Sequence, residues 1–542
     1  MAAKLSAALS TLQHTLSSSF THDIATRSTE NLPNYGEIIR DQTQLQPASR
    51  SRLFVLSADD EPSLGRHVEA LRSYLQENER DADDEWLSNF AYTLSERYSP
   101  CLYRASIIGD SAPKLRRLLS PNLKIYTASR QPIVGFVFTG QGAHWPGMGK
   151  ELLHTYPVFR QSLERCADYM SRLGAPYNAI GELSTVNQNN DARVLNGQRL
   201  MLPCAEEIEK LSHTSRLGHP LLSQPIVTAL QIALVDLLAD WGIYPDAVTG
   251  HSSGEIAAAY SAGILSMENA IAIAYYRGVT AKVLLEKGVR GAMMAVGMSA
   301  PDAQQYTATL RTGKATVGCI NSPVSVTVSG DEPAITEMET VLQDKEIFTR
   351  RLDVEVAYHS HHMNRIADSY LSSISHTRPL ADSTDTTQRP TKTRFFSSVT
   401  GCETSADELT PHYWVRNLVE PVKMADAIQS MCFYNSNGIP SSVPRTLHRR
   451  ILIPKKPSIH NIIEVGPHAA LAGPIKQTLK EYNSLERAHP DYNSMLVSAM
   501  DATSTALSVA AALVCNGYPV NLQSINDPSL RSEQQMLRNV SV

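Results

Sequence analysis

The spacing of apolar positions changes along the chain and predicts alternating strands and helices. Arg52–Leu56 (RLFVL) predicts a short buried strand, and the apolar residues within 64–75 and 87–94 recur every three or four positions, as in amphipathic helices. Another apolar run follows at 105–108. We expect a small α/β unit over residues 52–131, preceded by a disordered or irregular tail over residues 1–51.

A larger domain is expected over residues 132–495. It opens with the apolar strand Ile133–Thr139, which runs into a Gly-rich turn, and a second strand, turn and helix follow at 247–263. Strands that alternate with helices indicate a covered, mostly parallel sheet. Short β-rich runs between 290 and 351 predict an inserted α+β subdomain. Polar stretches at 183–222 and 434–458 predict loops.

Composition narrows the class of protein. The 542 residues carry a net charge of −5, which disfavours nucleic acid as the partner. The seven cysteines are scattered without a C-x-x-C pair, which indicates reduced thiols and neither disulfides nor zinc. No run approaches the ~18 apolar residues of a membrane helix, the nearest being 506–515, so we expect a soluble, cytoplasmic protein.

A candidate nucleophile lies in the segment G-H-S-S-G at residues 250–254. The motif stands between a short strand and an Ala-rich helix, which is the setting of a nucleophile elbow. Ser252 would be the nucleophile, and the start of the helix would present free N–H groups to an oxyanion. A Gly/Ser turn that merely caps a helix is the plain alternative, and a serine also needs a base.

Three histidines at 359, 361 and 362 follow a predicted strand in the segment VEVAYHSHHM. His359 is the preferred base, whereas His361 and His362 fit the exposed start of a helix. His359 and His362 could also share a helix face and bind a metal. No carboxylate follows at the spacing of a zinc protease, so we predict no metal site.

These segments resemble the acyltransferase domains of fungal reducing polyketide synthases, which are similar to malonyl-CoA:acyl carrier protein transacylases. The resemblance covers about residues 52–526 and rests on eight blocks in order. They are FVFTGQGAHWPGMGKEL, SQPIVTALQIAL, GHSSGEIAAAYSAG, YYRG, INSPVSVTVSG, AYHSHHM, YWVRNLVEPV and EVGPHAALAGPIKQ.

The resemblance implies an α/β-hydrolase-like main domain with a parallel sheet and a small ferredoxin-like subdomain at about 281–352. Residues 52–131 resemble the linker domain that precedes the acyltransferase in such synthases. The segment GYPVNLQSIN resembles the strand that follows it, so residues 496–542 would be a linker that returns to the first unit.

The resemblance also assigns roles at the reacting centre. Ser252 would be the nucleophile and His359 its general base, with a backbone carbonyl orienting the imidazole. The backbone N–H groups of Ser253 and Gln141 would hold the oxyanion. The turn at Gln141 also resembles a dinucleotide-binding loop, but Trp145 stands at the third glycine position.

Other residues would bind the substrate. Arg277 would pair with the free carboxylate of a malonyl or methylmalonyl group, although a surface charge near a helix end is the plain alternative. Gln224, Asn321 and His251 belong to blocks that line the site. Tyr358 stands where malonyl-selective members of the family carry Phe, and a bulky ring there disfavours an added methyl group.

The expected activity is transfer of malonyl from malonyl-CoA, through an acyl-serine, to the phosphopantetheine of an acyl carrier protein in polyketide or fatty acid biosynthesis. No metal or bound cofactor is expected, and no membrane or nucleic acid partner. The sequence carries no ketosynthase, carrier or reductase motif, so transfer in trans to a synthase's carrier is expected. A serine esterase or thioester hydrolase, and an inactive docking remnant, are the alternatives. Arg277 argues against the hydrolase.

Overall fold

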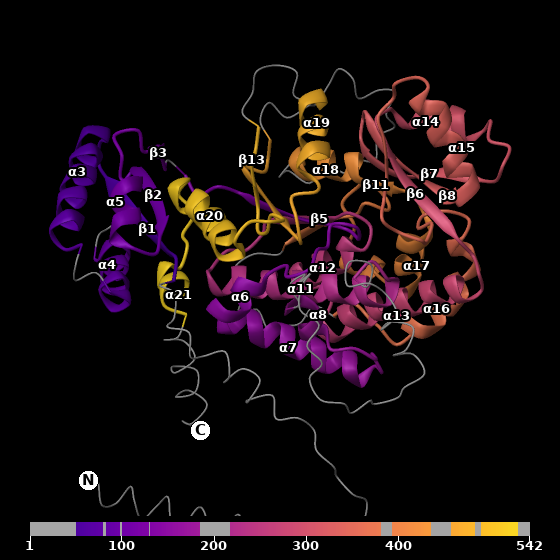
Figure 1. Cartoon of the computed structure of the whole chain (residues 1–542), viewed down its shortest axis with the longest axis horizontal. Coiled ribbons are helices and arrows are strands. Elements are labelled where there is room, and N and C mark those ends of the chain that lie inside the picture. Colours follow the sequence, from indigo (N-terminus) through magenta and orange to yellow (C-terminus); the bar gives the residue numbers. More distant parts are fainter. Residues whose placement is uncertain are drawn as a thin grey trace, which may run out of the picture. The chain divides into compact units, whose positions relative to one another are not determined.

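The computed structural model describes residues 50–79, 83–97, 100–128, 130–184, 217–380, 393–434, 457–482 and 489–528 (Figure 1). Residues 1–49 of the expected tail and most of the two expected loops lie outside these ranges. Helix α8 (Ala179–Ser184) and helix α11 (Pro220–Asp240) extend into the predicted loop at 183–222, so that prediction is wrong at both ends. Pro220 favours the start of α11, and the His219 side chain accepts a hydrogen bond from the N–H of Leu221.

The first unit is a three-stranded antiparallel sheet in the order β1-β2-β3. Asp60 and Asp83 cap the N-termini of helices α3 and α4, where their side chains accept hydrogen bonds from backbone N–H groups of the first turn. Apolar side chains of the strands and helices form a separate core. The elements are β1 (Arg52–Ala58), α3 (Glu61–Glu77), α4 (Asp84–Glu96), β2 (Tyr103–Gly109), α5 (Ala112–Leu118) and β3 (Tyr126–Thr127).

A five-stranded parallel sheet in the order β10-β5-β4-β12-β13 forms the centre of the main domain. Strands β4, β5 and β12 are buried along their whole length because helices cover both faces of the sheet. Because these strands are parallel, the turns that follow β4, β5 and β12 all lie at the carboxyl edge of the sheet. The strands are β4 (Val134–Phe138), β5 (Ala247–Gly250), β10 (Arg394–Phe396), β12 (Asn461–Val465) and β13 (Asp491–Ser494).

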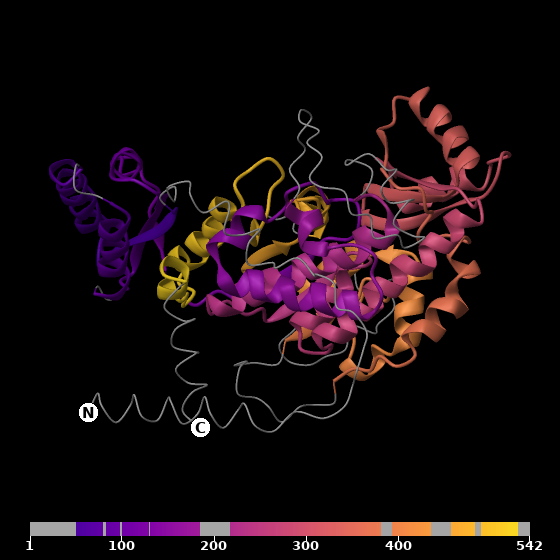
Figure 2. The same cartoon turned by 60° about the horizontal axis from the view of Figure 1, so that its bottom comes forward.

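Helices pack around this sheet and against one another (Figures 1 and 2). Helix α11 packs against α7, α12 and α13, and α18 packs against β5 and α19. The further helices are α6 (Lys150–Thr155), α7 (Pro157–Arg172), α12 (Gly254–Ser261), α13 (Met267–Glu286), α16 (Ala367–Ile374), α17 (Pro411–Val419), α18 (Met424–Cys432) and α19 (Ala472–Tyr482), with 3₁₀ turns η1 (Met363–Arg365) and η2 (Ala406–Glu408).

Helix α11 is long and apolar enough to cross a membrane, judged by length and composition alone. The expectation that no segment approaches this length is therefore wrong. It rested on unbroken apolar runs, whereas Gln224, Thr228 and Gln231 interrupt α11 and still leave its mean hydropathy high. Ninety-four per cent of the apolar window is buried inside the protein. Gln231 donates hydrogen bonds to the carbonyl groups of Thr139 and Val465 at the ends of β4 and β12. The helix therefore serves as a core element of the domain.

A second sheet, in the order β11-β7-β8-β6-β9, forms the predicted ferredoxin-like subdomain. Helices α14 and α15 lie on one side of it (Figure 1). Strand β11 pairs in parallel with β7 and adds an edge that the sequence pattern did not predict. The elements are β6 (Gly291–Val296), α14 (Ala300–Thr307), β7 (Ala315–Ser322), β8 (Ser325–Asp331), α15 (Glu332–Gln343), β9 (Thr349–Arg351) and β11 (Val422–Lys423).

The end of the described chain returns to its beginning (Figure 2). Helix α20 (Ala502–Cys515) packs against β2, and helix α21 (Leu522–Asn526) follows it. The side-chain amide of Asn526 accepts a hydrogen bond from the backbone N–H of Leu53 at 2.9 Å and donates one to the Leu53 carbonyl at 2.8 Å. This paired contact ties α21 to β1.

The buried carboxyl group of Glu464 on β12 predicts a pH-dependent stability. Thr139 Oγ1 donates to it at 2.9 Å, and burial raises its pKa to about 8. Because this value exceeds that of an unfolded glutamate, the folded protein holds an extra proton, and stability falls as pH rises from about 4.5 through 8. Glu464→Gln removes the ionisation. The melting temperature of the variant relative to that of the wild type should therefore rise by several degrees as the pH increases from about 5.5 to about 8.5.

Thermal unfolding at both pH values checks this expectation, with Glu481→Gln on the exposed face of α19 as the matched control. The control should follow the wild type at each pH. If the melting temperatures of Glu464→Gln and of the wild type changed equally between the two pH values, ionisation of this carboxyl group on unfolding would be contradicted.

Candidate active site

The turn that carries Ser252 connects β5 to α12 at the carboxyl edge of the parallel sheet. Ser252 has a φ of +53°, a left-handed conformation that costs energy for a residue with a Cβ atom. Glycine is required at 250, because a Cβ atom there would lie 2.3 Å from the backbone nitrogen of Glu255. A sharp, strained turn between a strand and a helix is the geometry of a nucleophile elbow.

The structure brings His359 to this serine. Ser252 Oγ lies 2.6 Å from His359 Nε2, and His359 Nδ1 lies 2.8 Å from the backbone carbonyl oxygen of Glu420. The carbonyl can only accept, so Nδ1 carries the proton and Nε2 is free to accept from the serine hydroxyl. His359 is also held in the left-handed region, with a φ of +59°.

The imidazole of His359 is neutral in this environment. Burial, followed by the nearby positive charge of Arg277, lowers its pKa to about 3. A neutral imidazole can take the proton of Ser252 at the moment of attack. The pair therefore has the arrangement of a nucleophile and a general base.

Arg277 on α13 places a buried guanidinium beside the same serine. Its Nη2 donates to Ser252 Oγ at 3.2 Å and its Nη1 to Asn417 Oδ1 at 2.9 Å, while the side chain of Tyr358 faces it at 5.7 Å from the ring centre. Only 1% of Arg277 is exposed, and burial lowers its pKa. Among the described residues no carboxylate forms an ion pair with Arg277, and its Nε has no hydrogen-bond partner.

A buried polar network lies behind the elbow. Asn417 on α17 donates to the Ser252 carbonyl at 3.0 Å and to Glu255 Oε2 at 2.8 Å. The hydroxyl of Tyr413 lies 2.7 Å from the same oxygen, and the N–H of Ser398 donates to Glu255 Oε1. Burial raises the pKa of Glu255. The network fixes the backbone of the nucleophile turn and one arm of the Arg277 fork.

Gln141, Gln224 and Tyr358 form a second group of polar side chains at the site. The amide of Gln141 donates to Ser223 Oγ at 2.9 Å and accepts from the amide of Gln224. The Tyr358 hydroxyl is buried without a well-formed hydrogen bond, and burial raises its pKa although Gln224 and Gln141 oppose the rise. Within the described chain, the backbone N–H groups of Gln141 and Ser253 donate to no protein acceptor. They are available to a ligand.

His251 lies between the first Gly-rich turn and the small sheet. A Cβ atom at Gly140 would lie 2.6 Å from the His251 carbonyl oxygen, so only glycine allows this approach. His251 Nε2 lies 2.9 Å from Asn321 Oδ1, and Asn321 donates to Thr327 Oγ1 at 3.1 Å. Burial lowers the pKa of His251.

The three histidines of the 359–362 segment separate in space. His359 faces Ser252, whereas His361 and His362 both face Asp331. The alternative that His359 and His362 share one metal is therefore wrong, since their ring nitrogens have different partners.

The comparisons with known proteins agree with this geometry. The sequence model described as "Acyl transferase domain" matches residues 135–444, which include every site residue named above. The chain belongs to the acyl transferase domain family. The acyltransferase class and the resemblance inferred from the sequence are thereby confirmed.

Relatives of this acyltransferase include the highly reducing polyketide synthase phiA of a fungal species (strain ATCC 74256). It is 42% identical over 478 residues, which are 88% of this chain and 17% of that synthase. The chain therefore spans about a sixth of the length of this relative.

Solved structures share the fold. The acyltransferase domain from module 8 of the salinomycin polyketide synthase matches with a TM-score of 0.66 and 23% identity, over 88% of this chain and 98% of that one. The SpnD acyltransferase domain in complex with 2-(pent-4-yn-1-yl)malonyl matches with a TM-score of 0.64 and 21% identity, over 89% of this chain and 98% of that one. The predicted fold class is confirmed.

Sequence reasoning missed Glu255 and Asn417 in this acyltransferase. Asn417 lies on α17, whose buried residues Tyr413, Trp414 and Leu418 mark an apolar face. An amide side chain among these apolar positions could have indicated a buried polar contact. The sequence offered no such indication for Glu255, because a glutamate in the first turn of a helix is commonly a surface residue.

Proposed function

We propose that this chain transfers a malonyl group from malonyl-CoA to the phosphopantetheine thiol of an acyl carrier protein, through an acyl ester on Ser252, in polyketide or fatty acid biosynthesis. The observation that carries the proposal is the buried guanidinium of Arg277 beside Ser252, without a carboxylate partner among the described residues. Burying an unpaired cation is costly, and a carboxylate on the acyl group would compensate it.

In the first half-reaction Ser252 Oγ attacks the thioester carbonyl carbon while His359 Nε2 takes its proton. The backbone N–H groups of Ser253 and Gln141 would bind the resulting oxyanion. Collapse of this intermediate breaks the C–S bond, and the protonated imidazole returns its proton to the departing coenzyme A thiolate. The carbonyl oxygen of Glu420 keeps the imidazole in the required tautomer.

The second half-reaction repeats these steps with a different nucleophile. The carrier's phosphopantetheine thiol gives its proton to His359 and attacks the ester carbon, and Ser252 leaves with that proton. Both halves use the same groups, and none of the steps requires a metal or a bound cofactor.

The choice of malonyl rests on two side chains. The fork of Arg277 matches a carboxylate bidentately, and the Tyr358 ring beside it would narrow the space for a substituent on the malonyl carbon. The SpnD domain, with a similar fold, is described in complex with a substituted malonyl group, which supports a dicarboxylic acyl group as the substrate proposed here. Gln224, Asn321 and His251 would line the remainder of the site.

Intact-protein mass spectrometry after incubation with malonyl-CoA or acetyl-CoA tests the proposal. We expect a malonyl adduct on the wild type and on Ser508→Ala, an exposed control on α20, and none on Ser252→Ala. A separately expressed carrier protein should then remove the adduct, which would also test transfer in trans. An acetyl adduct in preference to malonyl would favour a serine esterase, and the absence of any adduct would favour an inactive docking remnant.

A further inference from the structure

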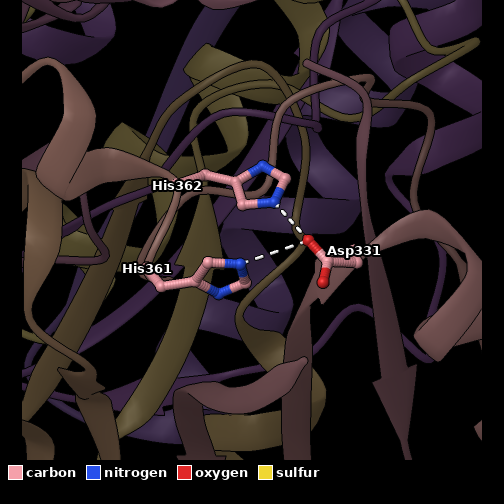
Figure 3. A group of neighbouring side chains, drawn as sticks. All are labelled: Asp331, His361 and His362. Atoms are coloured by element: carbon pink, nitrogen blue, oxygen red, sulfur yellow. Dashed lines mark hydrogen bonds and ion pairs between the residues drawn. The ribbon is translucent and has the colours of Figure 1, made fainter. Parts of the chain in front are cut away.

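A second group of ionisable side chains lies next to the proposed active site. Asp331 ends strand β8 and precedes helix α15 of the small sheet, and His361 and His362 belong to the turn that follows His359. Figure 3 shows both imidazole rings pointing toward one carboxylate oxygen of Asp331. None of these three side chains takes part in the transfer mechanism described above.

The three ligand atoms converge closely. Asp331 Oδ1 lies 3.1 Å from His361 Nε2 and 2.7 Å from His362 Nε2, and all three atoms lie within 4.8 Å of one another. Zinc bonds of about 2.0–2.2 Å in a tetrahedron require ligand atoms roughly 3.3–3.5 Å apart. Small movements of these side chains would therefore create three corners of such a site.

The surroundings support a metal site and leave one corner open. The backbone N–H of Lys314 donates to Asp331 Oδ2 at 2.8 Å and so orients the carboxylate from behind. The side chain of His362 is 3% exposed, whereas those of His361 and Asp331 are 33% and 32% exposed. The open side gives water access to a fourth position.

We propose that Asp331, His361 and His362 bind one divalent transition-metal ion, with zinc preferred by the ligand set and water as the fourth ligand. Binding replaces the hydrogen bonds to Asp331 Oδ1, and each imidazole then coordinates through Nε2 while its proton resides on Nδ1. This site differs from the sequence expectation of no metal, because Asp331 lies thirty residues before the histidines and only the fold brings it to them.

The ion would join the small sheet to the turn that carries the proposed base. His361 follows His359 by two residues, and Asp331 belongs to β8. A bound ion would therefore restrain the position of His359. This consequence for transfer rests on the proposed function, whereas the binding itself does not.

Titration of the metal-free full chain with Co²⁺ tests the site directly, because tetrahedral Co²⁺ gives visible absorption bands that do not depend on acyl transfer. We expect one Co²⁺ per chain, displacement by one Zn²⁺, and a higher melting temperature in Zn²⁺. His361→Ala and Asp331→Asn should each weaken binding by at least about tenfold. His412→Ala, an exposed histidine on α17, is the matched control and should bind like the wild type.

Melting of each metal-free variant shows whether it is folded, and His361→Ala is the safer variant because its side chain is partly exposed. Absence of Co²⁺ bands in the folded wild type would overturn the proposal. Binding that both variants retain would overturn it as well, since it would place the ion elsewhere and leave the three residues as a hydrogen-bonded contact.

Discussion

Replacement of His359 with asparagine is expected to slow formation of the malonyl-enzyme by about 10²–10⁴-fold. The His359 imidazole, whose Nε2 lies 2.6 Å from Ser252 Oγ, is the proposed acceptor of the serine proton, and the variant lacks it. Asparagine is the suitable substitution because His359 has a φ of +59°, which asparagine adopts more readily than most residues. The loss should therefore arise from chemistry and not from a disturbed turn.

Single-turnover measurement of the malonyl adduct against time gives the rate of acylation. Thermal unfolding of the same preparation shows that the turn is retained, and His376→Ala, an exposed histidine after α16, is the control. A folded His359→Asn protein that acylates at the wild-type rate would contradict the role of His359 as the base. A slower rate with an unchanged melting temperature would support it.

The proposed reacting pair could be named from the sequence because its signals are local. The elbow requires glycines at 250 and 254 within five residues of one another, and His359 stands in a short segment typical of the family. The order of the strands was not predictable in this way, since β10 and β13 reach the edges of the parallel sheet through long connections. Strand β11 has only two residues and no periodic pattern.

The support of the site depends on contacts between distant segments. Asn417 follows Ser252 by 165 positions, and the spacing of residues contains no information about such a contact. Arg277 could be named from the resemblance, but its burial without a carboxylate partner in the described chain is a property of the fold. Asp331 likewise becomes a neighbour of His361 and His362 only when β8 is placed beside the turn.

Replacement of Arg277 with alanine is expected to separate malonyl from acetyl transfer. Without the guanidinium, the malonyl carboxylate would be buried without its partner, which costs the complex several kcal/mol, so kcat/KM for malonyl-CoA should fall by about 10²–10³-fold. Acetyl-CoA has no carboxylate, and its kcat/KM should remain within about tenfold of wild type. Arg277→Lys keeps the charge but loses the fork, and an intermediate value is expected.

Steady-state kinetics with both donors checks this expectation, with Arg172→Ala on the exposed side of α7 as the control. Because Arg277 is buried and donates to Asn417 Oδ1 at 2.9 Å, thermal unfolding of each variant is measured alongside to show that the fold is retained. An equal fall with malonyl-CoA and acetyl-CoA would instead assign Arg277 to positioning Ser252 Oγ, which it contacts at 3.2 Å. The ratio of the two donors therefore decides between recognition of a carboxylate and support of the nucleophile.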